Sequence, residues 1–139
     1  MSLDSLQAVM NRSVEAATPF ARSLFMPAQW DAQQVQQFVN EVGNMTVATV
    51  NASGMPHAAP VIAGCADGTL CFSVSPKSVL LRNLAAGSRI AFTVVGSGHN
   101  VLGQGSAEPV GELADWATSL AHSASSLASV GLSSSRGRA

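Results

Sequence analysis

Two hydroxyl groups and one ammonium group fall within four residues, in the segment Ser75-Pro76-Lys77-Ser78. Apolar residues at helical spacing follow as far as Gly87, so we predict that Ser75 caps a helix and that Pro76 is its first residue. Free backbone N–H groups at such a helix start, together with Lys77 and the hydroxyls of Ser75 and Ser78, attract a phosphate or a carboxylate. An ordinary helix cap beside a solvated lysine is the alternative.

Two histidines lie next to breaks in β-like runs. His57 precedes Pro60, and a proline inside such a run indicates a strand edge, a bulge or a bend. A bent backbone can offer its N–H and C=O groups to a ligand. A structural role is the more common one for a single strand histidine such as His57, and His99 is a candidate for reaching the ligand of a neighbouring subunit.

The cysteines and glycines match no motif for metal or dinucleotide binding. Cys65 and Cys71 do not have the Cys-x-x-Cys spacing of redox and zinc sites, so we interpret them as reduced core residues and predict no metal site. Gly96, Gly98 and Gly103 do not form Gly-x-Gly-x-x-Gly between a strand and a helix, which argues against a dinucleotide fingerprint.

The elements that must position these residues are short strands flanked by helices. Asp31 and Gln34 have capping-box spacing, and Gly43 is placed to end the helix that they begin. Turn residues at short intervals separate the β-like runs, which is typical of a small, mostly antiparallel barrel. We expect one domain: N-terminal helices packing on the barrel (residues 1–44), the barrel core (45–110), and a C-terminal helix with a mobile tail from Ser133 (111–139).

The composition limits the partners of the chain. Of its 139 residues, 11% are charged, against about 25% in a typical soluble domain. We therefore expect an apolar face to be buried against a second copy, in a homodimer. A net charge of −1 without a Lys/Arg-rich patch argues against nucleic acid. No basic and apolar leader and no apolar run of 18 residues occur, so we expect a cytoplasmic protein without a membrane partner.

The order and spacing of three segments, residues 47–61, 67–75 and 82–92, resemble the pyridoxamine 5′-phosphate oxidase-like FMN-binding split β-barrel family. This family includes flavin- and deazaflavin-dependent oxidoreductases. The resemblance covers residues 45–110 and implies an α+β, mainly β fold: an antiparallel split β-barrel with flanking helices. It also implies a homodimer with two cofactor sites at its interface.

The resemblance also implies which residues hold the cofactor. In such proteins the second strand lays its backbone along the isoalloxazine ring, and the end of the third strand with the following turn approaches the ribityl chain and the phosphate. The matching residues are Ala59, Pro60, Val61 and Ile62 for the ring, and Ser73, Val74, Ser75, Lys77 and Ser78 for the chain and phosphate.

The chain departs from the family pattern at two places. Val79 and Leu80 stand where flavin-binding members usually carry a basic pair, and the Ser/Ala-rich end shows no match to the family's last barrel strand. The resemblance nevertheless implies an oxidoreductase that uses FMN, or alternatively a deazaflavin, for hydride transfer to or from a small organic substrate. The first alternative is a non-catalytic flavin- or haem-binding protein with a degenerate phosphate site. The second is a dimer with an empty site that acts through its surface. No catalytic residue can be assigned.

Overall fold

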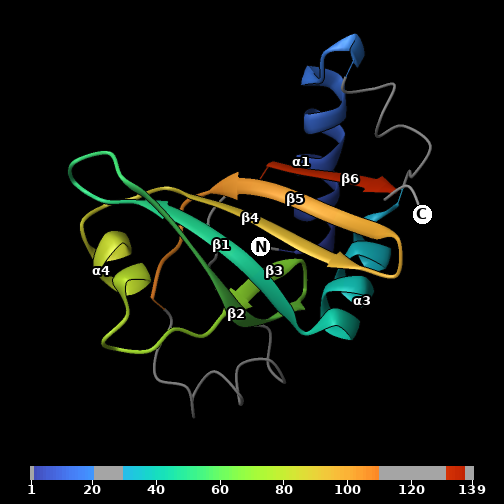
Figure 1. Cartoon of the computed structure of the whole chain (residues 1–139). Coiled ribbons are helices and arrows are strands. Elements are labelled where there is room, and N and C mark those ends of the chain that lie inside the picture. Colours follow the sequence, from blue (N-terminus) through green and yellow to red (C-terminus); the bar gives the residue numbers. More distant parts are fainter. Residues whose placement is uncertain (1, 21–29, 110–130, 137–139) are drawn as a thin grey trace.

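Six antiparallel strands form one curled sheet in the order β3-β2-β1-β4-β5-β6 (Figure 1). This computed structural model describes residues 2–20, 30–109 and 131–136. The fold is α+β and mainly β, which confirms the predicted class. The strands are β1 (Asn44–Val50), β2 (Pro56–Ala66), β3 (Thr69–Phe72), β4 (Ile90–Gly96), β5 (His99–Gly105) and β6 (Gly131–Arg136).

Alternation along β1 defines an inner and an outer face of the sheet. Met45, Val47 and Thr49 are buried, whereas Thr46 and Val50 between and beyond them are exposed. Three helices contribute buried side chains to the core on the inner face: α1 (Leu3–Ala16), α3 (Ala32–Val42) and α4 (Val79–Ala85). The outer face of the sheet therefore has no described helix packed on it.

Strand β2 changes partners halfway along its length. It pairs with β1 from Pro56 to Ile62 and with β3 from Ala63 onward. Pro60, opposite Thr46, lies in the half that pairs with one strand among the described residues. A proline is tolerated where one side of a strand is open, so the predicted strand edge at Pro60 is confirmed.

Helix α3 begins and ends where the sequence predicts. The Asp31 side chain accepts from the Gln34 backbone at 2.8 Å, and the Gln34 side chain accepts from the Asp31 backbone at 2.9 Å. Gly43 ends the helix in the left-handed conformation, at φ 73°. Val35, Phe38 and Val39 are buried on one face of this helix.

The N-terminal helical region has two segments. Helix α1 is capped by Ser2 and ends at Ala16. A second helical segment begins at Pro19, directly after Thr18, and its course beyond Phe20 lies outside the described residues.

The C-terminal end differs from the expected tail. Residues 131–136 form β6, which pairs with β5 from His99 opposite Arg136 to Gln104 opposite Gly131. The expectation of a mobile tail from Ser133, without a match to the last barrel strand, was therefore wrong for this segment. The serines of this segment show no alternation of apolar and polar residues, so the sequence does not predict a strand here. The strand forms because the open edge of β5 can pair with any extended backbone. The C-terminal helix predicted after residue 110 lies outside the described residues.

Candidate functional site

The four residues predicted to border the flavin ring lie on the half of β2 that pairs only with β1 among the described residues. Ala59 and Val61 are half-buried on the inner side, where they pair with Val47 and Met45. Pro60 is exposed on the outer side, and Ile62 is 63% exposed there. The segment therefore offers backbone groups along one edge and a side chain on each face of the sheet.

A backbone hydrogen bond joins the two predicted cofactor segments. Strand β3 ends at Phe72, and the Ser73 backbone N–H donates to the Ile62 carbonyl oxygen at 3.0 Å. Ser73 and Val74 are half-buried, and Val74 packs against the core. The chain therefore leaves β3 beside the end of the Ala59–Ile62 segment, as the resemblance implies.

The helix predicted to begin at Ser75 begins three residues later. Ser78 is the N-cap of α4, and its hydroxyl accepts from the Leu81 N–H at 3.1 Å. Ser75 instead closes a turn: its carbonyl accepts from the Ser78 N–H at 3.0 Å and its hydroxyl from the Lys77 N–H at 3.3 Å. The prediction failed because both serines can cap and because Pro76 suits a turn as well as a helix start.

The charge next to this turn comes from one lysine. Lys77 is exposed and directly precedes the cap of α4. At the two positions that lack the family's basic pair, Leu80 is 1% exposed and belongs to the core, whereas Val79 is 42% exposed. A phosphate there would therefore meet Lys77 and the turn hydroxyls, and Val79 marks a surface position open to a second cation.

A buried polar cluster that the sequence did not predict lies under α4. Asn83 is 3% exposed and Thr49 1% exposed, and the Asn83 Nδ2 donates to the Thr49 Oγ1 at 3.0 Å. His57 pairs with Thr49 across β1 and β2, and its Nδ1 is buried without a hydrogen-bond partner among the described residues. The sequence contained one signal for this cluster: Thr49 follows Met45 and Val47 at two-residue steps along the strand, so its hydroxyl lies on the same inner face.

The two cysteines are free and buried. Burial is the main cause that raises the pKa of the Cys65 thiol from 9.0 to about 12, with a smaller contribution from Cys71. A thiol with so high a pKa is not a nucleophile near neutral pH. In the part of the chain that the structure describes, no group of three or more His, Cys, Asp or Glu side chains could hold a metal ion.

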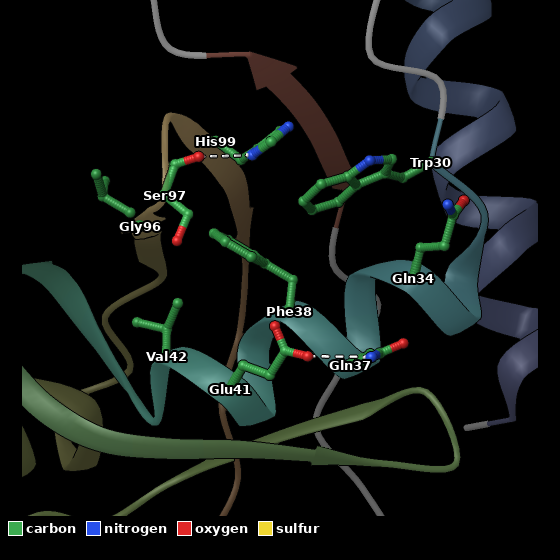
Figure 2. A pocket seen from close by; sticks show the side chains of 10 residues that line it. Trp30, Gln34, Gln37, Phe38, Glu41, Val42, Gly96, Ser97 and His99 are labelled. Atoms are coloured by element: carbon green, nitrogen blue, oxygen red, sulfur yellow. Dashed lines mark hydrogen bonds between the residues drawn. The ribbon is translucent and has the colours of Figure 1, made fainter. Parts of the chain in front are cut away.

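A cleft of about 590 Å³ lies elsewhere, between α3 and the β4–β5 turn (Figure 2). Trp30 stacks on His99 with ring centroids 4.8 Å apart, and Phe38 meets Trp30 edge to face at 5.0 Å. Glu41, Val95 and Ser97 are among the other lining residues. Of the residues that the sequence analysis singled out, only His99 lines this cleft.

Among the described residues, no helix has the length and apolarity needed to cross a membrane.

Comparison with known proteins agrees with this geometry. The family model described as pyridoxamine 5′-phosphate oxidase matches residues 32–136. No curated protein sequence matches the chain. A conserved hypothetical protein from Mycobacterium tuberculosis has a similar structure, with a TM-score of 0.55 and 25% identity over 63% of this chain, which spans 57% of that protein.

Two proteins from Mycobacterium smegmatis have the same fold. An FAD-binding protein matches with a TM-score of 0.57 and 16% identity, over 79% of this chain and 98% of its own. An FAD- and haem-binding protein matches with a TM-score of 0.59 and 20% identity, over 77% of this chain and 71% of its own. Because the family model covers most of the sequence and the fold agrees with it, the chain belongs to the pyridoxamine 5′-phosphate oxidase-like family of flavin-binding split β-barrels.

Proposed function

We propose that this protein binds FMN and is an oxidoreductase that transfers hydride to or from a small organic substrate. The observation that carries the proposal is the hydrogen bond from the Ser73 N–H to the Ile62 carbonyl oxygen, at 3.0 Å. It brings the two cofactor segments to one place, although ten residues separate them in the sequence. A deazaflavin is the alternative cofactor, because the same backbone edge suits any flavin-like ring.

The described residues fit such a cofactor. The open edge of Ala59–Ile62 offers backbone groups to a planar ring, and Ser73 and Val74 continue from it toward the turn. Ser75, Lys77 and Ser78 provide hydroxyls and one cation for the phosphate. A bound flavin supplies the hydride chemistry itself, and the protein's part is to hold the ring and exclude competing reactions.

His57 is the titratable side chain beside the proposed ring edge. It lies two residues before Ala59, in phase with it on the inner face of β2. Its buried Nδ1 lacks a hydrogen-bond partner among the described residues. Because a buried polar atom without a partner is costly, we propose that a bound cofactor or a water molecule completes this bond.

A homodimer is part of the proposal. The outer face of the sheet is uncharged: β1, β2, β4 and β5 contain no Asp, Glu, Lys or Arg. Across this face Ala48 lies between Ala58 and Ala91, and Ile62 and Val95 are 63% and 66% exposed. An uncharged face of four strands is typical of a surface that a second copy covers. We also propose a cytoplasmic location, which the two free thiols support.

The alternative is a flavin- or haem-binding protein without catalysis. It is favoured by Val79 and Leu80 at the positions where the family usually has a basic pair, which leaves the exposed Lys77 as the cation of this turn, and one similar structure binds both FAD and haem. The discriminating experiment is the mass and absorbance spectrum of the molecule that copurifies with the protein. It is followed by turnover assays with reduced nicotinamide or reduced deazaflavin.

A yellow protein that absorbs near about 450 nm and turns over supports the oxidoreductase, since that absorption belongs to the oxidised flavin. A flavin spectrum without turnover supports the binding protein. A protein that stays colourless during titration with both FMN and deazaflavin contradicts the two cofactor proposals together.

A further inference from the structure

The cleft between α3 and the β4–β5 turn is separate from the proposed flavin site. None of its lining residues belongs to the Ala59–Ile62 segment or to the turn before α4. In Figure 1, α3 and α4 lie at opposite ends of the sheet. Its volume of about 590 Å³ falls in the usual range for small-molecule pockets, about 300–1,000 Å³.

Three rings form one wall of this cleft (Figure 2). Trp30 lies nearly parallel to His99, with 29° between the ring planes, and Phe38 is inclined at 62° to Trp30. Phe38 is also 6.3 Å from His99. Aromatic rings carry negative charge on their faces and attract cations placed over them, with Trp the strongest.

The charged side chain among the residues that line the cleft is an acid. Glu41 is the carboxylate among the lining residues, which include no Lys or Arg. The Gln37 Nε2 donates to the Glu41 Oε1 at 3.0 Å and so orients this carboxylate (Figure 2). The His99 Nδ1 lies 2.9 Å from the Ser97 carbonyl oxygen, which can only accept. The Nδ1 therefore carries the proton, and in the neutral ring the Nε2 is left as an acceptor.

We propose that this cleft binds a small organic cation, an amine that carries an aromatic or branched apolar group. The carboxylate of Glu41 pairs with the ammonium group, and the Trp30 and Phe38 rings take the apolar part. An anion would meet a carboxylate without a compensating cation, and a neutral ligand would gain only from the rings. This inference does not depend on flavin binding.

The test is calorimetric titration of the full-length protein at pH 7 with three probes of one shape: phenethylammonium, 2-phenylethanol and phenylacetate. Phenethylammonium is expected to bind saturably, at least about tenfold more tightly than the alcohol, and phenylacetate is expected not to bind. Equal affinities for the three probes, or no saturable binding of phenethylammonium, overturn the proposal.

Variants locate the binding in the cleft. Glu41→Gln is expected to weaken phenethylammonium about tenfold, and Glu41→Asp is expected to retain most of the affinity because it keeps the charge. Glu108→Gln is the matched control, since Glu108 is also exposed but does not line the cleft. Unchanged affinity in Glu41→Gln contradicts the proposal. Glu41 lies in the last turn of α3, where removing a negative charge favours the helix, so this variant is expected to fold.

A further variant addresses the neighbouring strand. The register of β6 places Arg136 opposite His99. Arg136→Ala is expected to bind phenethylammonium at least as tightly as the natural chain, because removing a positive charge from the chain takes away no attraction for an ammonium group. Loss of binding in this variant overturns the proposal. FMN titration of Glu41→Gln, read by absorbance, reports separately on the flavin site.

Discussion

The side-chain amide of Asn40 makes two hydrogen bonds to the backbone of Cys65. The Asn40 Nδ2 donates to the Cys65 carbonyl at 2.8 Å, and the Cys65 N–H donates to the Asn40 Oδ1 at 2.7 Å. They occur just beyond Ile62, where β2 has left β1 and its backbone needs a new partner. The amide of α3 therefore replaces a neighbouring strand and fixes the helix to the bend of β2.

Replacing Asn40 by Asp is expected to destabilise the fold by about 1–3 kcal/mol, because a carboxylate cannot donate to the Cys65 carbonyl and the carbonyl loses its partner. Urea unfolding measures this loss. Gln33→Asp is the matched control: Gln33 is exposed on the same helix, and its change is expected to stay within about 0.5 kcal/mol. Equal losses in the two variants would contradict the proposed role of Asn40.

Gly68→Ala is expected to cost about 2–5 kcal/mol of stability. Gly68 has φ +75°, and an added Cβ would clash with the Ser2 carbonyl oxygen and lie 3.0 Å from the Leu6 Cβ. The substitution therefore combines left-handed strain with a clash against the start of α1. Gly54→Ala is the control, since Gly54 has φ +85° with nothing within 4 Å of the added Cβ. Thermal unfolding should show a clearly larger loss for Gly68→Ala, and a reversed order would refute the packing argument.

The stability of the protein is expected to fall above pH 9. The pKa of Cys65 is raised from 9.0 to about 12, mainly by burial, so the unfolded chain releases this proton first. The protonated Cys65 thiol contributes its full stabilisation below the pKa that it has in the unfolded chain. This contribution is lost as the pH rises toward the pKa of the thiol in the folded protein, at up to about 1.4 kcal/mol per pH unit. Urea unfolding from pH 8 to 11 should show a shallower slope for Cys65→Ala than for the natural chain. Identical slopes would exclude the thiol as the cause.

Ala91→Glu is expected to convert the proposed homodimer into a monomer. Ala91 is exposed on the outer sheet face and pairs with Ala48, so a carboxylate there would be buried without a partner when a second copy covers the face. Sedimentation equilibrium of the natural chain and of the variant gives the answer. Gln33→Glu is the control: Gln33 is exposed on α3, so this variant adds the same charge away from the outer sheet face and should remain dimeric. A dimeric Ala91→Glu variant would place the interface elsewhere.

How much of the fold the sequence predicts depends on the range of the interactions. Asp31, Gln34 and Gly43 cap one helix through contacts four residues apart or closer, so local chemistry was enough to place both ends. The same local reasoning failed at α4, because Ser75 and Ser78 can both cap and three residues separate them. Strand β6 was missed because its serines show no apolar alternation, and its partner β5 lies far away in the sequence.

The candidate site shows the same difference between what family resemblance or local sequence predicts and what long-range contacts decide. The resemblance to the family predicted a cofactor site at the Ala59–Ile62 segment and the turn after β3, and the Ser73 to Ile62 hydrogen bond joins these two segments. The Asn83 to Thr49 hydrogen bond joins residues 34 positions apart and was not predicted. The aromatic wall of Trp30, Phe38 and His99 also depends on long-range packing, which no spacing in the sequence reveals.

The charge at the start of α4 is expected to control FMN affinity. Lys77→Ala removes the exposed cation and should weaken FMN about tenfold, since a charge-assisted contact contributes about 1.5–3 kcal/mol. Val79→Lys adds a second cation at an exposed position and should strengthen FMN by a similar factor. Gln33→Lys, on α3, adds the same charge elsewhere and should leave the affinity unchanged.

Titration of the purified protein with FMN, followed by flavin absorbance, tests the central claim most directly. We expect saturable binding whose affinity rises in the order Lys77→Ala, natural chain, Val79→Lys. The same affinity in all three proteins, or no binding of FMN to any of them, would contradict a flavin phosphate site between the end of β3 and the start of α4.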